Sequence, residues 1–450
     1  MQSLKLWHKF TSGSINRQIF GAAAIVGVAT LIVRLAAFIK EQIVASTFGT
    51  TDAIDAFLVA LMVPAFVITL VSGSFNAALI PTYIQLKEKS GKAAAERLLA
   101  NVVIWNIGLL VLVTVIIVST APLYLPHLAI GFDRAKLNLT FQLLCVISPV
   151  ILVSGVVTSW SAVLNAGDKF ALAALTPIIT PLITIALLFL AKSLGVFSLA
   201  VGLVIGALLE GICLALFLTK QGINIIPKWS KFDENLRHVS QQYIPMIAGS
   251  LLMNTAPIID QSMAAMLPAG SVAALNYGNR VIALPITLLT TALSTALIPY
   301  FSKMVAKQDW GGIIHTLKHY LLLCLAITIP ITVGFFYLSE PITQLIYQRG
   351  QFSQKDTLIV AQIQSMYSLQ LPFYVCNILV VRLISALQAN HILMWSSLLN
   401  ALINITLNIV LLQVMGIAGI ALSTSCMYVI CLSFTSYCCF KILRKANVGA

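Results

Sequence analysis

Residues 196–219 read VFSLAVGLVIGALLEGICLALFLT, a run that contains a single charged side chain, Glu210. A helix of roughly 20 apolar residues crosses the hydrocarbon core of a bilayer. Similar runs recur along the chain, which has 450 residues, 59% of them hydrophobic and 9% charged. An ordinary soluble domain has about a quarter of its residues charged. The composition therefore excludes a water-soluble globule and predicts a protein whose exterior faces lipid.

Twelve such runs, bounded by charged residues, glycine or proline, predict twelve transmembrane helices. The runs lack the alternation of polar and apolar residues, over about ten residues, that marks a membrane β-barrel. We therefore expect an all-α polytopic membrane protein. The predicted spans are 20–46, 55–85, 98–121, 138–165, 170–192, 196–219, 243–267, 272–302, 314–338, 357–389, 392–414 and 417–440.

The two halves of the sequence repeat each other. Pro81 in the first half and Pro299 in the second end the similar segments SGSFNAALIP and TALSTALIP. Gly195 opens the segment GVFSLA, and Gly416 opens the similar segment GIAGIA at nearly the same offset. Six helices in each half give the halves the same orientation. Parallel repeats of this kind are typical of transporters that work by alternating access, so we expect two parallel six-helix bundles with a central cavity.

The distribution of positive charge predicts the orientation. Of the 27 Lys and Arg residues, 18 fall in segments on the side of the N-terminus and five on the opposite side. Because basic loops stay cytoplasmic, both termini are predicted to be cytoplasmic. We expect bundles at 1–220 and 243–450, joined by a cytoplasmic linker at 221–242. The net charge of +13 is explained by loops beside anionic membrane lipid and indicates no nucleic-acid partner.

Four further basic side chains, not counted among those 18 and five, lie inside predicted spans: Arg34 and Lys40 in the first, Arg280 in the eighth and Arg382 in the tenth. A charge at the bilayer centre costs about 2.5–3.5 kcal/mol even on the lenient insertion scale, so these residues are functional candidates. Guanidinium groups bind phosphate bidentately and stay charged. We expect an anion site for a lipid-linked diphosphate headgroup. For Lys40, a side chain that reaches out to the helix end is an equally good interpretation.

Two acidic side chains, Glu41 and Glu210, also fall within predicted spans. Each of them has two equally good interpretations, as Lys40 does. Each side chain either reaches out to a helix end or points into the bundle.

A group of oxygen-bearing side chains lies in the C-terminal half. Asp260 is in the middle of the seventh span, and Asn400, Asn404 and Asn408 follow one face of the eleventh helix. Thr424 lies in the twelfth. Carboxylate, amide and hydroxyl oxygens suit a small monovalent cation, and the carboxylate alone suits a proton. Hydrogen bonding between helices, without a bound ion, explains the same residues.

Three blocks of residues resemble the MurJ/MviN family of lipid II flippases, part of the polysaccharide and drug exporter superfamily. The first block is RLAAFIKE at 34–41, followed by FG at 48–49 and DAF at 55–57. The second is YGNR at 277–280, and the third is LIYQRGQF at 345–352. The resemblance runs along the whole chain.

This resemblance implies a transporter, not an enzyme, that moves an undecaprenyl-diphosphate-linked glycan, most simply lipid II, from the inner to the outer leaflet of the bacterial plasma membrane. It implies no cofactor, with Na⁺ or H⁺ as candidate coupling ion, and the cell-envelope synthesis machinery as candidate partner. On this basis the expected substrate-binding residues are Arg34, Lys40, Asp55, Arg280 and Arg382, and the expected cation ligands are Asp260, Asn404, Asn408 and Thr424.

Two departures from the family pattern keep alternatives open. Lys40-Glu41 stands where the family usually has Arg-Asp, and the uncharged residues Val67, Ile68 and Thr69 stand where basic residues are expected. A flippase for another lipid-linked oligosaccharide, such as an O-antigen or exopolysaccharide unit, fits these departures. A cation-coupled multidrug exporter shares the fold but predicts an acidic cavity. A membrane glycosyltransferase would need a paired acid motif on a long loop, and the sequence has none.

Overall fold

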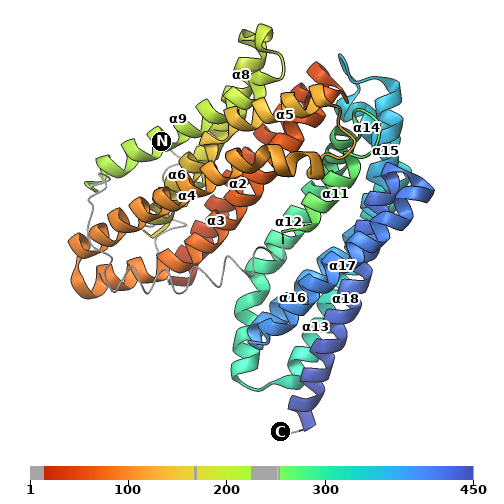
Figure 1. Cartoon of the computed structure of the whole chain (residues 1–450). Helices are drawn as coiled ribbons and strands as arrows, with labels where there is room; N and C mark the ends of the chain where they lie inside the picture. Colours follow the sequence, from red (N-terminus) through yellow and green to blue (C-terminus); the bar gives the residue numbers. More distant parts are fainter. Residues whose placement is uncertain (1–14, 167–169, 224–250, 252–253, 449–450) are drawn as a thin grey trace, which may run out of the picture. The chain divides into compact units, whose positions relative to one another are not determined.

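The computed structural model describes residues 15–166, 170–223, 251 and 254–448, which are almost entirely helical (Figure 1). The predicted all-α class is confirmed, and the described residues contain no strand. The elements are α2 (Ile15–Phe48), α3 (Asp52–Ser90), α4 (Lys92–Leu128), α5 (Arg134–Ile147), α6 (Pro149–Ala166), α7 (Phe170–Leu175), η1 (Thr176–Ile178), α8 (Ile179–Leu190), η2 (Lys192–Leu194), α9 (Phe197–Lys220), α11 (Ala256–Ala264), α12 (Ser271–Ala306), α13 (Trp310–Tyr337), α14 (Ser339–Tyr347), α15 (Gln354–Ser368), α16 (Gln370–Ala386), α17 (Asn390–Met415) and α18 (Ile417–Val448).

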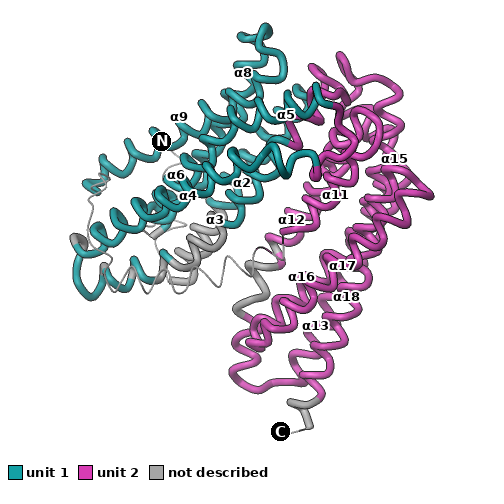
Figure 2. The backbone as a smooth tube through the Cα atoms, in the orientation of Figure 1, with its two compact units in different colours: residues 1–44, 60–126, 134–250 teal, residues 45–59, 127–133, 251–450 magenta. Residues whose placement is uncertain are grey.

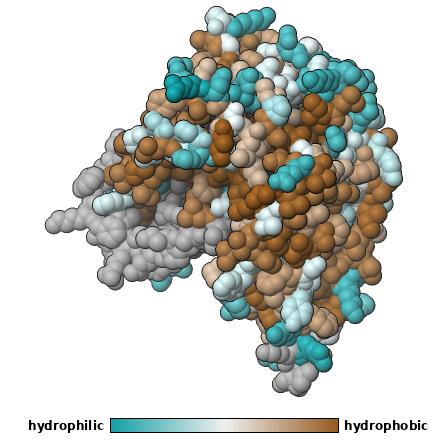
Figure 3. All heavy atoms as spheres, turned by 45° about the vertical axis from the view of Figure 1, so that its right-hand side comes forward, coloured by the Kyte–Doolittle hydropathy of each residue, from teal (hydrophilic) through white to brown (hydrophobic). Residues whose placement is uncertain are grey.

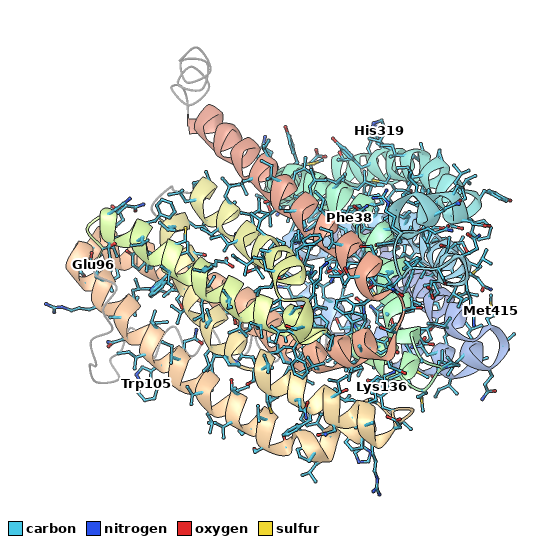
Figure 4. The ribbon with its side chains drawn as sticks, turned by 90° about the horizontal axis from the view of Figure 1, so that it is seen from above. Phe38, Glu96, Trp105, Lys136, His319 and Met415 are labelled. Atoms are coloured by element: carbon cyan, nitrogen blue, oxygen red, sulfur yellow. The ribbon has the colours of Figure 1, made fainter. Side chains whose placement is uncertain are left out.

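Within the described residues, ten helices are long and apolar enough to cross a membrane, and each falls on a predicted span. The predicted span 20–46 lies in α2, which is not among the ten. The predicted span 243–267 lies partly outside the described residues. Apolar side chains cover much of the helix surfaces: Trp105, 45% exposed, lies on the outward side of α4 (Figure 4). Such surfaces suit contact with lipid tails.

Prolines interrupt some predicted spans and not others. Pro149 begins α6 directly after α5, and Pro177 lies in the short 3-10 turn η1 between α7 and α8. Since proline lacks an N–H and clashes with the preceding turn, a break is expected at these positions. By contrast, α13 continues through Pro330, and α12 continues through Pro285. A proline inside a membrane helix is tolerated where neighbouring helices satisfy the backbone groups that it leaves without a partner.

The chain divides into two compact units (Figure 2). Unit 1 comprises residues 1–44, 60–126 and 134–250, and unit 2 comprises 45–59, 127–133 and 251–450. Most of the predicted linker 221–242 lies outside the described residues. The core of unit 1 joins α3, α4, α6 and α9, and the core of unit 2 joins α12, α13, α16 and α18. On the face of unit 2 that Figure 3 brings forward, hydrophobic residues cover the middle and hydrophilic residues gather toward the ends.

The internal repeat is visible in the backbone of each half. Gly195 ends η2 with φ 53° and ψ −132°. Its counterpart Gly416 ends α17 with φ 59° and ψ −138°. Both angles lie in a region that favours glycine, because a Cβ atom would be strained there. The two glycines thus turn the chain in the same way before the last long helix of each half.

Candidate substrate and cation sites

Asp260 is the centre of a buried hydrogen-bonded cluster in unit 2. Its Oδ1 accepts hydrogen bonds from Asn404 Nδ2 at 3.0 Å and Asn408 Nδ2 at 2.8 Å. Its Oδ2 accepts from Thr424 Oγ1 at 3.0 Å. Asp260 is 7% exposed, and both asparagines are fully buried. The structure therefore brings together the four residues expected to form the cation site, from α11, α17 and α18.

Local sequence explains how these side chains meet. Pro257 sits in the first turn of α11, a helix of nine residues that begins just before Asp260. Asn404 and Asn408 are four residues apart and therefore share one face of α17. Short helices within a bundle are typical of the binding regions of transporters. Asn400 was predicted to share this face of α17, but the hydrogen bonds to Asp260 in the described residues do not include it. Its Oδ1 is buried without a hydrogen-bond partner.

The cluster offers oxygen ligands of the kind that a hard cation needs. The Oδ1 atom of Asn408 is buried without a hydrogen-bond partner. Side-chain amide orientation is assigned from hydrogen bonds, so rotating an amide would turn its oxygen toward an ion beside the carboxylate. A carboxylate, two amide oxygens and a hydroxyl match the donor set of an alkali cation. The residues present thus fit the cation expected from the sequence.

The basic residues predicted to bind substrate occur in both units. In unit 1, α2 carries Arg34, which is exposed, and Lys40, whose Nζ lies 2.9 Å from Glu41 Oε1. In unit 2, Arg280 is exposed on α12 and Arg382 is half-buried on α16. Helices α12 and α16 pack against each other. The Lys40–Glu41 ion pair was not predicted, although the adjacent opposite charges were its sequence signal.

Asp55, the fifth predicted substrate residue, is only 1% exposed and caps the start of α12. Its Oδ2 accepts a hydrogen bond from Gly270 N at 2.7 Å, and its Oδ1 accepts one from Ala273 N at 2.8 Å. A carboxylate at a helix N-terminus satisfies backbone N–H groups that have no partner within the helix and interacts favourably with the helix dipole. This capping role was missed from sequence because both partners lie in the opposite half of the chain.

Glycines allow three segments of unit 2 to approach closely around this cap. Gly49, Gly270 and Gly350 all have positive φ, at 59°, 85° and 58°. A Cβ on Gly49 would lie 2.7 Å from the Gln351 carbonyl oxygen, and one on Gly270 or Gly350 would meet a backbone oxygen of residue 50 or 46. Side chains are excluded at these contacts by both space and backbone conformation. Several residues of the family-like blocks therefore have a structural role here.

Replacing Asp55 with alanine should lower the stability of the protein. Two buried N–H groups would lose their acceptor, and each unsatisfied buried group costs about 1–3 kcal/mol. Asp55→Asn keeps one acceptor oxygen and should lower stability less. Thermal unfolding of the purified protein in detergent measures the difference, with Glu340→Ala, an exposed acid on α14, as the control. An unchanged melting temperature for Asp55→Ala would contradict the capping role.

Two bundles of long apolar helices, a buried oxygen cluster and basic side chains within helices define a polytopic membrane transporter. The sequence model of the family described as "Lipid II flippase MurJ" matches residues 44–448. The chain therefore belongs to the MurJ family.

Known proteins agree with this assignment. A probable lipid II flippase MurJ from Synechocystis is 28% identical over 432 residues, covering 92% of this chain and 80% of the relative. Its counterpart from Rickettsia prowazekii is 26% identical and covers 90% of this chain and 81% of the relative. A solved lipid II flippase MurJ, in an inward closed conformation, matches with a TM-score of 0.81 and 25% identity over 94% of this chain and 90% of that chain. A multidrug transporter of the MATE family matches with the same TM-score at 11% identity. The match covers 94% of this chain and 99% of that chain, which shows that the two share a fold.

Proposed function

We propose that this protein translocates lipid II from the cytoplasmic to the outer leaflet of the bacterial plasma membrane by alternating access. The observation that carries the proposal is the match of residues 44–448 to the lipid II flippase family. The reaction is transport across the membrane and requires no covalent chemistry. The lipid-linked diphosphate is the substrate, and the cell-envelope synthesis machinery is the expected partner.

Basic side chains account for recognition of the substrate in this proposal. The guanidinium groups of Arg34, Arg280 and Arg382 and the ammonium group of Lys40 would bind the diphosphate, because planar guanidinium forks match phosphate oxygens. The polyprenyl tail would remain among lipid tails. Asp55 would contribute by holding the start of α12, the helix that carries Arg280. Its direct contact with substrate stays a prediction.

We also propose that Asp260, Asn404, Asn408 and Thr424 bind the coupling ion, Na⁺ or H⁺. The cluster is buried, and the described residues contain no ion pair to Asp260. An uncompensated carboxylate inside a membrane is costly, so a bound cation or proton would stabilise it. Binding of an ion there would bias the packing of α11 against α17 and α18, since its ligands come from all three helices.

Depletion of the protein in its host tests the transported lipid. Lipid II should accumulate in the cytoplasmic leaflet, because its synthesis would continue without export. Extraction of lipid-linked intermediates and mass spectrometry would identify the accumulating species. Accumulation of a different undecaprenyl-diphosphate glycan, with lipid II unchanged, would favour the alternative substrate that the uncharged residues 67–69 suggest.

The predicted orientation gives a topology test. A Lys355→Cys protein should react with a membrane-impermeant maleimide in intact cells from which the outer membrane has been removed, whereas Lys307→Cys should react only after permeabilisation. Both side chains are exposed at helix ends, at the start of α15 and after α12. The parent chain, with its native cysteines, provides the blank. The reverse pattern would contradict cytoplasmic termini.

A further inference from the structure

Glu210 is a buried carboxyl group near the middle of α9 in unit 1. It is 9% exposed and lies several turns from either end of the helix Phe197–Lys220. At about 1.5 Å per residue the nearer end is about 15 Å away. A glutamate side chain cannot span that distance, which excludes the interpretation that it reaches the membrane surface.

Two of the helices packed against α9, α6 and α8, contain no ionisable side chain. Helix α9 packs against α5, α6, α8, η1 and η2, and neither α6 nor the segment 170–190 contains an ionisable residue. Within the described part of the chain, Glu210 has no hydrogen-bond or ion-pair partner. The titratable groups of α5, η2 and the rest of α9 are Arg134, Lys136, Cys145, Lys192, Cys213 and Lys220. The core that α9 shares with α3 and α4 adds Tyr83, and Glu96 and Arg97 lie next to its α4 residues.

Of those groups, Cys213 lies one turn from Glu210 and is uncharged as a thiol, whereas the basic residues lie near the ends of their helices. Arg134 and Lys136 belong to the first turn of α5, and Lys220 is the last residue of α9. Tyr83 packs in the core of unit 1 that includes Leu214 and Leu218, and the α4 residues of that core lie on both sides of Glu96 and Arg97 in the sequence. Among the described residues no basic side chain forms an ion pair with Glu210, and α9 has no basic residue before Lys220.

Hydroxyl groups and a broken helix lie beside this face of α9. Gly202 and Gly206 let α9 approach α8 so closely that an added methyl group would lie 3.0 Å from Thr184 Oγ1 and Thr180 Oγ1, respectively. Glu210 is one turn beyond Gly206, toward η1 and the buried Thr176. Pro181 lacks an N–H, which leaves the carbonyl of Pro177 without its usual helical donor. A protonated carboxyl could donate to such a carbonyl or hydroxyl.

The internal repeat shows that a carboxyl is not needed for packing at this position. The alignment that pairs Gly195 with Gly416 also pairs Glu210 with Cys431. Cys431 is 2% exposed, and its sulfur lies 3.2 Å from Ser396 Oγ and 3.3 Å from Asn377 Nδ2. The C-terminal half thus fills the position with a small, neutral, partnered group. The N-terminal half keeps an ionisable one.

We propose that Glu210 is an exchangeable proton-binding site of the N-terminal bundle, separate from the oxygen cluster at Asp260. Charge on Glu210 is uncompensated inside the bundle, so the side chain holds a proton there. It releases the proton only when water or a cation reaches the site. Proton binding at Glu210 does not depend on which lipid the protein moves.

Carbodiimide labelling of the purified full-length protein tests the proposal. Dicyclohexylcarbodiimide adds to protonated carboxyl groups in apolar surroundings, and digestion with mass spectrometry locates the adduct. We expect an adduct on the peptide containing residues 197–220 that disappears as pH rises. It should be absent in Glu210→Gln and present in Glu210→Asp. Exposed Glu340 serves as an internal control and should remain unlabelled.

An infrared titration provides an independent readout on the folded protein. The absorption of a protonated carboxyl group should decrease as pH rises in the wild type, and Glu210→Gln should lack that component. Labelling that does not vary with pH would overturn the proposal. So would the absence of labelling together with the same infrared titration in the wild type and in Glu210→Gln. Protection of Glu210 from the reagent by Na⁺ at fixed pH would instead assign the site to a metal cation and also overturn it.

Discussion

Arg280→Ala should reduce lipid II translocation by about tenfold or more. A hydrogen bond to a charged group contributes about 1.5–3 kcal/mol, and each 1.36 kcal/mol corresponds to about a tenfold change in rate. Arg34→Ala should have an effect of the same size, because both guanidinium groups are proposed to bind the diphosphate. Arg280→Lys should recover part of the loss, since an ammonium group keeps the charge but not the bidentate geometry. Reconstituted vesicles with labelled lipid II measure the rate.

Arg134→Ala is the matched control for these variants. Arg134 is an exposed arginine in the first turn of α5, in a predicted extracytoplasmic loop, and its loss should leave the rate unchanged. Thermal unfolding of each variant separates loss of binding from loss of folding. Wild-type rates in both Arg34→Ala and Arg280→Ala vesicles would contradict the proposed anion site.

Asp260→Asn should abolish the dependence of the protein on its coupling ion. The carboxylate is the only formal negative charge in the oxygen cluster, and ligand charge tunes the affinity of hard-cation sites over several orders of magnitude. Loss of that charge should weaken Na⁺ binding by at least about tenfold. For the wild type we expect the melting temperature to rise with NaCl but not with choline chloride at the same ionic strength. For Asp260→Asn we expect no such difference.

Two further variants localise that effect. Asn408→Leu should also remove the Na⁺ dependence, because Asn408 donates to Asp260 at 2.8 Å. Thr406→Val changes a neighbouring residue of α17 whose hydroxyl donates to Leu402 O of the same helix, and this variant should keep the dependence. A melting temperature that responds to pH but not to Na⁺ would assign the cluster to a proton. A response to neither would contradict an ion site there.

The membrane helices could be predicted because their signal is local. A run such as 196–219 contains nearly all the information needed to identify α9, and both boundaries of α9 agree closely with the prediction. Helix interruptions were harder to predict. Pro149 and Pro177 break their spans, whereas Pro330 does not. What decides between these outcomes is how neighbouring helices satisfy the freed backbone groups, which the local sequence does not contain.

The residues of the candidate sites could likewise be predicted only where the signal lies in the local sequence. The asparagine stripe on α17 could be predicted from its helical spacing, and its contact with Asp260 followed once α11 was in place. Asp55 was assigned to substrate from a family resemblance alone. Its observed partners, Gly270 and Ala273, lie at the start of a helix in the other half of the sequence, so no local pattern could identify the cap.

Translocation of purified lipid II in reconstituted vesicles tests the central claim most directly. Vesicles containing this protein should expose lipid II from the inner leaflet at the outer surface faster than protein-free vesicles and vesicles containing Arg280→Ala. They should move lipid II in preference to an undecaprenyl-diphosphate carrying an unrelated glycan. Transport of the unrelated glycan alone, or no lipid II transport by correctly folded protein with Na⁺ and a membrane potential present, would contradict assignment as a lipid II flippase.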